Sequence, residues 1–139
     1  MKQSTLIVAA AVLMLGGCAQ MDGKWGGDTS TRRPPDPHSP WVFVVQDKYI
    51  VVDQEPIVVP REQRDFVITW SLPKGSPYAF AENGIRISDA GDEFNCGLDS
   101  DRQKYTCQFR NSKRGRYKYT INIVGGPNKI EALDPFIMN

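Results

Sequence analysis

From residue 41 onward, apolar and polar side chains alternate repeatedly at every second position, and no stretch repeats with a helical period. The clearest run places four large side chains on one face: Tyr117, Tyr119, Ile121 and Ile123. Alternation of this kind is typical of half-buried strands. A series of roughly eight short strands in a domain of this size predicts an all-β fold, a single antiparallel two-sheet sandwich.

The other expected strands are short runs rich in β-branched and aromatic residues, separated by turn-forming residues. Asn83-Gly84 favours a type I′ turn, which predicts a hairpin with Phe80 opposite Ile87. A second hairpin is expected around a turn centred between Asp101 and Arg102. The runs are 41–45, 49–52, 56–59, 66–72, 78–82, 85–88, 93–96 and 105–109.

The first 17 residues are laid out as a secretory signal peptide. Lys2 is followed by an apolar stretch, Leu6–Leu15, which is too short to span a membrane. Leu15-Gly16-Gly17-Cys18 resembles the lipobox of bacterial lipoproteins. That resemblance implies cleavage before Cys18 and lipidation of this cysteine. The alternative is an ordinary secretory signal followed by a chance cysteine.

Ala19 after the lipidated position implies, within the lipoprotein family, the outer membrane, facing the periplasm, with the cell surface as an alternative. Residues 18–40 have no hydrophobic period and are rich in Gly and Pro, so we expect a disordered tether. Three parts result: the signal peptide at 1–17, the tether at 18–40 and the sandwich domain at 41–139.

Two cysteines remain in the domain, Cys96 and Cys107. They lie at equal distances from the expected turn at Asp101-Arg102, and an exported chain meets an oxidising compartment. We therefore expect one disulfide across this hairpin. Free thiols, or a metal-binding or redox-active pair, are the alternatives, although Cys-x-x-Cys spacing and a neighbouring histidine are both missing.

Two features of the domain resemble the immunoglobulin-like group. Trp70 stands alone in the middle of a core strand, and Gly115-Arg116-Tyr117-Lys118-Tyr119 resembles the tyrosine-corner strand. The resemblance implies an immunoglobulin-like sandwich. With its ending Leu133–Asn139, the domain also resembles small uncharacterised proteobacterial envelope proteins, which implies the same fold and no particular activity. We expect the ending to be a docked strand, with a partner-binding tail as the alternative.

Catalytic and cofactor motifs are sparse. His38, in the tether, is the only histidine, so a Ser-His-Asp or Cys-His arrangement and a His-based metal site are not expected. No glycine loop has the context that cradles phosphate. We therefore predict no enzyme, no cofactor and no metal. Acidic residues at turns leave a weak calcium site or a carboxylate hydrolase as alternatives: Asp89, Asp92, Glu93, Asp99 and Asp101.

Overall charge is balanced, with 17 Lys+Arg against 16 Asp+Glu, so a nucleic-acid partner is not expected. Basic residues nevertheless gather at the start of the last long strand. We take six residues as the candidate binding surface, with an ordinary solvated face as the alternative: Lys74, Asn111, Lys113, Arg114, Arg116 and Lys118.

These observations favour a non-catalytic envelope lipoprotein that binds a protein partner or serves as a structural accessory. A different hypothesis is a periplasmic inhibitor or immunity protein against a cell-wall-degrading enzyme, with the loop Gly97–Lys104 as its probe. A third is an enzyme that acts through paired carboxylates. The oligomeric state is left open by the sequence.

Overall fold

The computed structural model describes residues 35–139, which form nine β-strands and no helix. The all-β prediction is confirmed, and the strands follow the expected runs closely. Their bounds are β1 Val42–Val45, β2 Tyr49–Val52, β3 Ile57–Val58, β4 Phe66–Ser71, β5 Tyr78–Ile87, β6 Phe94–Leu98, β7 Lys104–Phe109, β8 Arg116–Gly125 and β9 Phe136–Met138.

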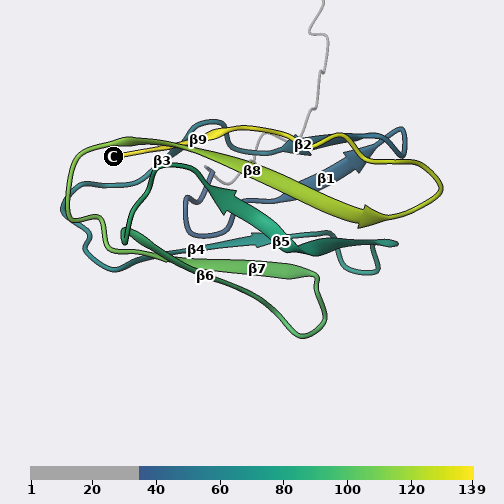
Figure 1. The fold of residues 1–139 in the computed structure, drawn as a ribbon, viewed down its shortest axis with the longest axis horizontal. Coiled ribbons are helices and arrows are strands. Elements are labelled where there is room, and N and C mark those ends of the chain that lie inside the picture. Colours follow the sequence, from purple (N-terminus) through teal and green to yellow (C-terminus); the bar gives the residue numbers. More distant parts are fainter. Residues whose placement is uncertain (1–34) are drawn as a thin grey trace, which may run out of the picture. The chain divides into compact units, whose positions relative to one another are not determined.

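The strands form a two-layer sandwich with immunoglobulin-like pairing (Figure 1). One sheet has the order β4-β7-β6, and the other contains β5, β8 and β9 side by side. If β4 to β9 are lettered B to G along the chain, the first sheet has the order B-E-D and the second contains C-F-G, as in an immunoglobulin sandwich. β3 extends the second sheet by pairing in parallel with β9, so one edge departs from the antiparallel pattern. The β1–β2 hairpin is a further two-stranded unit.

The core lies between the sheets and follows the predicted alternation. Tyr117, Tyr119, Ile121 and Ile123 of β8 are all buried, while the residues between them are exposed or half-buried. Trp70 of β4 is fully buried, and its indole Nε1 donates a hydrogen bond of 3.4 Å to the Tyr119 hydroxyl across the core. The contact between Trp70 and Tyr119 thus joins the two sheets at the centre of the core.

The start of β8 has the geometry of a tyrosine corner. The Tyr117 hydroxyl donates to the backbone carbonyl of Lys113 over 3.5 Å, four residues upstream. The ring lies so close to Gly115 that a Cβ there would be 2.7 Å from it. The Gly-x-Tyr spacing is therefore required by this contact, and the expected likeness to the immunoglobulin-like group is confirmed at this corner.

The prediction of a hairpin at Asn83-Gly84 is wrong. Residues 78–87 form one continuous strand, β5, and both of its halves pair with β8. Tyr78–Phe80 pair with Ile123–Gly125, and Ile85–Ile87 pair with Tyr119–Ile121. Residues 81–84 of β5 therefore form a large bulge. β8 is ten residues long and apolar along its inner face, so it can pair with both halves of β5. In a local hairpin the two halves of β5 would pair with each other instead, and part of β8 would have no partner.

Gly84 is needed by this bulge because the backbone folds closely onto Phe80. A Cβ at Gly84 would lie 2.8 Å from the Phe80 Cβ and 2.9 Å from the Ala81 carbonyl oxygen. We expect Gly84→Ala to lower the free energy of unfolding by about 1–3 kcal/mol in urea titrations, the usual cost of overpacking. The matched control is Gly97→Ala, where a Cβ meets nothing within 4 Å. Equal effects of the two substitutions would contradict this account of the bulge.

The second expected hairpin is confirmed, together with its disulfide. β6 and β7 pair so that Cys96 lies opposite Cys107, and the two are bonded, with their Cα atoms 4.0 Å apart. Cys107 is fully buried, whereas Cys96 lies exposed on the outer strand of the sheet. The bridge joins neighbouring strands of one sheet, unlike the inter-sheet disulfide of antibody domains.

The ordered domain begins earlier than residue 41. The backbone amides of Thr69 and Ser71 donate to the carbonyls of His38 and Pro40, so residues 38–41 run parallel to β4. The His38 ring stacks on Phe66 at 3.9 Å between centroids. Pro40 is fully buried. Residues 38–40, which the sequence assigns to the tether, thus lie against the sandwich, because the open edge of β4 offers the segment backbone partners.

The C-terminal ending is docked, as expected. β9 lies between β8 and β3, and its Ile137 is fully buried. The predicted signal peptide, the predicted lipobox with Cys18 and the predicted tether up to residue 34 lie outside the described residues.

Candidate functional site

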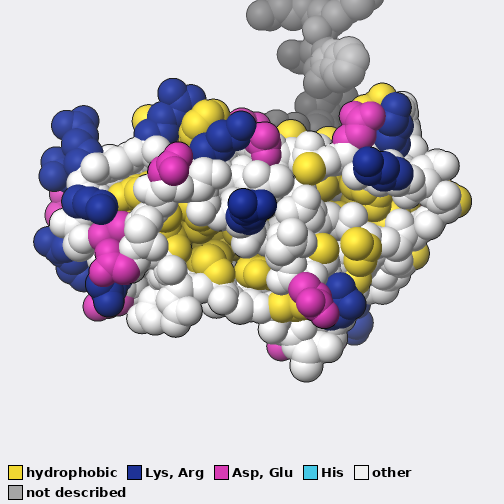
Figure 2. All heavy atoms as spheres, viewed as in Figure 1, with side chains coloured by type: hydrophobic (Ala, Val, Ile, Leu, Met, Phe, Trp, Pro, Cys, Tyr) yellow, Lys and Arg dark blue, Asp and Glu magenta, His cyan; other side chains and the backbone are white. Residues whose placement is uncertain are grey.

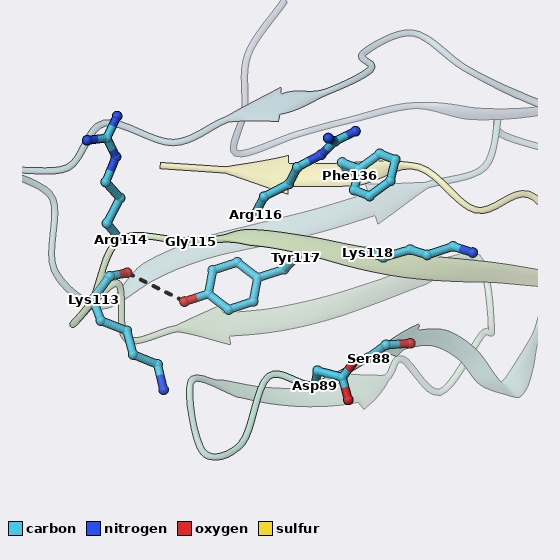
Figure 3. Close-up of a pocket in the computed structure, with 9 residues that line it drawn as sticks. All are labelled: Ser88, Asp89, Lys113, Arg114, Gly115, Arg116, Tyr117, Lys118 and Phe136. Carbon is cyan, nitrogen blue, oxygen red and sulfur yellow. Dashed lines mark hydrogen bonds between the residues drawn. The ribbon is translucent and has the colours of Figure 1, made fainter.

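Basic side chains gather at the end of the domain where β7 connects to β8, the left-hand end in Figure 2. A concavity of about 460 Å³ opens there along the first residues of β8. Its cations are four basic residues of the predicted surface, and we call it the basic groove (Figure 3): Lys113, Arg114, Arg116 and Lys118. It is lined by Ser88, Asp89, Lys113, Arg114, Gly115, Arg116, Tyr117, Lys118 and Phe136.

Two of the four cations are held in place by the C-terminal segment. The Arg116 guanidinium lies over the Phe136 ring, 3.8 Å from its centroid, and Lys118 Nζ is 3.0 Å from the carboxylate of Asp134. A hydrogen bond from Thr120, together with Lys118, holds the pKa of Asp134 below its ordinary value. Phe136 and Asp134 therefore orient Arg116 and Lys118. The negative charge of Asp134 offsets part of the positive charge that Lys118 presents to the groove.

All four cations of the groove are exposed, and Lys113 and Arg114 differ from the other two in their contacts. Both are exposed, and neither has an ion-pair partner within residues 35–139. Figure 3 shows Lys113 pointing to the side of the strand where Asp89 lies, and Arg114 pointing to the opposite side. The ring of Tyr117 lies on the same side of the strand as Lys113, with its hydroxyl directed at the Lys113 backbone carbonyl.

The loop that carries these cations is tied to the turn before β6 by Glu93. Although Glu93 is only 2% exposed, its carboxylate accepts hydrogen bonds from the Ser112 backbone amide, at 3.0 Å, and from the Ser112 hydroxyl. Burial alone would raise the pKa of Glu93, but the two Ser112 hydrogen bonds and the nearby Lys113 charge bring this pKa below its ordinary value. The loop is therefore braced by an ionised, buried carboxylate.

This brace predicts a loss of stability in acid. Because the folded pKa is below the unfolded value, the contribution of Glu93 is present above the unfolded pKa, about 4.3, and is lost as pH falls through the folded pKa. We expect Glu93→Gln to be destabilising at pH 7 and less so at pH 3, measured by urea unfolding, because the contribution of the ionised carboxylate decreases as the pH falls.

The control for this prediction is Asp92→Asn. Asp92 pairs with Arg110 at 2.6 Å, but both side chains are more than half exposed, at 77% and 59%. Such a surface pair contributes only about 0–1 kcal/mol. A cost of Glu93→Gln that is the same at both pH values would contradict the assignment of an ionised brace.

Asn111 does not belong to the exposed surface on which it was expected. It is 3% exposed, and its amide nitrogen donates to the carbonyls of Pro60, at 2.9 Å, and Gln63, at 2.7 Å. Its amide oxygen accepts from the side chain of Asn139. Asn111, at a positive φ of 52°, therefore clamps the β3–β4 loop and the C-terminus together behind the groove.

Lys74 is likewise separated from the other candidates. It lies in the turn between β4 and β5, which is at the end of the sandwich opposite the β7–β8 connection. The predicted surface thus contains one groove of four residues, one structural residue and one isolated lysine.

The acidic residues are dispersed. Asp99 accepts from the backbone amide of Ser100, and Asp101 from that of Gln103, so both stabilise the β6–β7 turn. Asp92 pairs with Arg110, Glu93 binds Ser112, and Asp89 lines the basic groove. Within the part of the chain that the structure describes, no three His, Cys, Asp or Glu side chains are grouped as a metal site would require.

Phe136 and Ser88 are groove residues that the sequence analysis did not identify. Phe136 is far from Arg116 in the sequence and reaches it only because β9 pairs with β8, with Lys118 opposite Phe136. The apolar C-terminal ending indicated that this segment docks on the domain. It did not indicate that the segment pairs with β8.

Compared with protein-family models, curated proteins and solved structures, the chain matches none. Residues 35–139 include no helix long and apolar enough to cross a membrane.

Proposed function

We propose that this protein is a non-catalytic, lipid-anchored envelope protein that binds an acidic segment of a protein partner in its basic groove. The observation that carries the proposal is the composition of the groove: four cations and one carboxylate line a single concavity. End loops of sandwiches are common binding surfaces, because a rigid scaffold positions them.

The groove is organised for recognition of a negative surface. All four cations are exposed, and two of them are oriented by neighbours, Arg116 by Phe136 and Lys118 by Asp134. An isolated surface ion pair contributes only about 0–1 kcal/mol, so no single lysine would suffice. Several cations of one sign act together by steering the partner and by excluding surfaces of the same sign.

The location in the envelope rests on the N-terminal sequence. Leu15-Gly16-Gly17-Cys18 supports lipidation at Cys18, and Ala19 supports the outer membrane facing the periplasm, with the cell surface as the alternative. The disulfide Cys96–Cys107 fits an oxidising compartment.

The test is chemical cross-linking in intact cells, followed by capture of the full-length protein. We expect a partner that is recovered with the unaltered chain and lost with the double variant Lys113→Glu/Arg114→Glu. In a parallel capture without cross-linking, its recovery should also fall as the salt concentration rises, since exposed charges are screened beyond about 8 Å at physiological ionic strength. The matched control is Lys74→Glu/Lys129→Glu, which reverses two charges outside the groove.

A partner retained by the groove variant and lost by the control variant would refute the groove as the binding surface. Recovery that does not depend on salt would show that charge does not drive the contact. Cys18→Ala, examined in parallel, reports whether the contact requires the anchor.

A second candidate function, inhibition of a cell-wall-degrading enzyme, is favoured by the β6–β7 hairpin. Its turn projects from the body of the domain in Figure 1. The base of the turn is braced, because Arg102 Nε donates to the Phe80 carbonyl at 3.1 Å and Gln103 Nε2 to the Tyr78 carbonyl at 2.9 Å. A projecting loop that is rigid before binding suits an inhibitor, since little conformational entropy is lost on association.

The inhibitor hypothesis is tested with purified wall hydrolases of the same envelope. We expect Asp99→Asn/Asp101→Asn to relieve inhibition by removing both charges from the exposed turn. The unfolding midpoint should stay close to that of the unaltered protein, because asparagine keeps the side-chain oxygen that accepts from the backbone amides of Ser100 and Gln103. If the unaltered protein inhibits none of these enzymes, this candidate is eliminated and the groove proposal is unaffected.

A further inference from the structure

The outward face of the β1–β2 hairpin is apolar over its whole length. In the pairing register, Phe43 lies opposite Val51 and Val45 opposite Tyr49. Trp41 precedes them on the same side of the strand. Each of these side chains is substantially exposed: Trp41 43%, Phe43 39%, Val45 41%, Tyr49 42% and Val51 44%. We call these five residues the hairpin face.

The hairpin is apolar on its other side as well. Val42 and Ile50 are buried in the core, and Val44 and Val52 pack against it. The core therefore accounts for one side of these strands only. A contiguous exposed apolar patch with charged ends marks a surface that binds a protein or a membrane.

The hairpin is held firmly in this position. Its turn uses positive φ values at Gln46 and Asp47, and the Asp47 carboxylate accepts a hydrogen bond from the Tyr78 hydroxyl. Lys48 pairs with Glu131 at 3.3 Å. At the other end the Trp41 amide donates to the Asp53 carboxylate at 2.8 Å. Exposure of the hairpin face is therefore a property of the folded domain.

The chain itself indicates what this face meets. Residues 38–41 lead directly into β1, so the N-terminal part of the chain enters the domain at Trp41. Cys18 lies only 23 residues before Trp41, which limits the separation of the two to roughly 80 Å even for a fully extended chain. A lipid on Cys18 would thus hold the hairpin face at high effective concentration near the bilayer.

The side chains fit the boundary between lipid and water. Tryptophan and tyrosine place an apolar ring in the acyl region and a polar group among the headgroups, and they are enriched at membrane interfaces for this reason. Trp41 and Tyr49 bracket Phe43, Val45 and Val51 on the hairpin face.

We propose that the hairpin face of Trp41, Phe43, Val45, Tyr49 and Val51 docks on the surface of the phospholipid bilayer that holds the lipid anchor. The interaction rests on the lipidation proposed above, and it adds a second, reversible contact between the protein and the membrane. The anchor supplies proximity, and the aromatic and aliphatic side chains supply the interfacial contact.

The test uses the full lipidated chain, reconstituted in vesicles of phosphatidylethanolamine and phosphatidylglycerol whose acyl chains carry bromine near the headgroup. Trp25→Phe leaves Trp41 and the fully buried Trp70 as fluorophores. We expect bromine to quench roughly half of the Trp41 emission, as for a ring at interfacial depth. The doubly substituted chain Trp25→Phe/Trp41→Phe reports Trp70 alone and should show almost no quenching.

Val51→Glu tests the hairpin face directly, since it places a charge at the centre of the apolar surface. In the Trp25→Phe chain it should abolish most of the Trp41 quenching. The matched control is Val67→Glu, with a similar exposure of 42%, on the outward side of the β4-β7-β6 sheet. It should leave the quenching unchanged. Circular dichroism is the check that both variants are folded.

Two results would overturn the proposal, and they are distinguishable. A mass of the N-terminal peptide without added lipid on Cys18 would refute the anchor, and with it this docking. A lipidated chain whose Trp41 is unquenched would refute docking alone, and would leave the hairpin face to a protein partner.

Discussion

Trp70→Ala should lower the free energy of unfolding by about 3–5 kcal/mol, the range for truncating a large core side chain. The side chain is fully buried at the centre of β4, and its ring lies 5.3 Å from that of Tyr119 on the opposite sheet. Truncation leaves a cavity between the sheets. It also removes the donor from the buried Tyr119 hydroxyl, whose pKa is raised by burial. An unpartnered polar group in the core adds to the cost.

The measurement is urea unfolding followed by circular dichroism, with the slope of the transition compared between variants. Val67→Ala is the matched control, because it removes apolar atoms from the same strand at a side chain that is 42% exposed. It should change the free energy by no more than about 0.5 kcal/mol. Trp70→Phe keeps most of the ring volume and should fall between the two. A cost below about 1 kcal/mol for Trp70→Ala would contradict the central position assigned to this residue.

Removal of the disulfide by Cys96→Ala/Cys107→Ala should cost about 3 kcal/mol, because the bridge restricts the unfolded chain over a loop of this size. The sequence separation of the two cysteines is 11. A domain of this length has only about 5–15 kcal/mol of stability in total, so the loss is a large fraction. Urea unfolding with and without a thiol reductant provides the measurement.

The reductant should destabilise the unaltered protein and have no effect on the double variant. The two single variants add a further comparison, since Cys107 is fully buried and Cys96 is exposed. Cys107→Ala loses core packing as well as the bridge and should be the more destabilising. Equal stability of the oxidised and reduced protein would show that the cross-link does not contribute.

Most of the strands could be predicted because their side-chain alternation is local information. β8 is the best example, since its four inward residues occupy alternate positions within ten. The β6–β7 hairpin was also predictable, as the two cysteines flank the turn symmetrically and fix the register Cys96–Cys107.

Turn chemistry was misleading where a long partner strand was present. Asn83-Gly84 has the preferred residues for a type I′ turn but lies in the bulge of β5, because β8 pairs with the strand on both sides of it. The turn of the β1–β2 hairpin instead uses Gln46 and Asp47, both at positive φ. Its position is stabilised by a contact with Tyr78, which lies in another strand and is invisible to a local rule.

Only the local part of the basic groove could be predicted from the sequence. Its cations are neighbours in the sequence, whereas the residues that orient them, Phe136 and Asp134, come from the C-terminal segment. Asn111 had the polarity of a surface residue, and only the tertiary contacts with Pro60, Gln63 and Asn139 show that it is buried. The alternation rule also could not assign 41–45 to one face, since the run is apolar at every position.

The parallel pairing of residues 38–41 with β4 has a mechanical consequence. Tension applied to the N-terminal side of the chain and directed along β4 would load the hydrogen bonds from Thr69 to His38 and from Ser71 to Pro40 together, in shear. Bonds loaded together resist force better than bonds that open one after another, as they do when a strand is peeled from its end. A pull on the lipid anchor proposed at Cys18 would therefore reach these hydrogen bonds before it reaches the sandwich behind them.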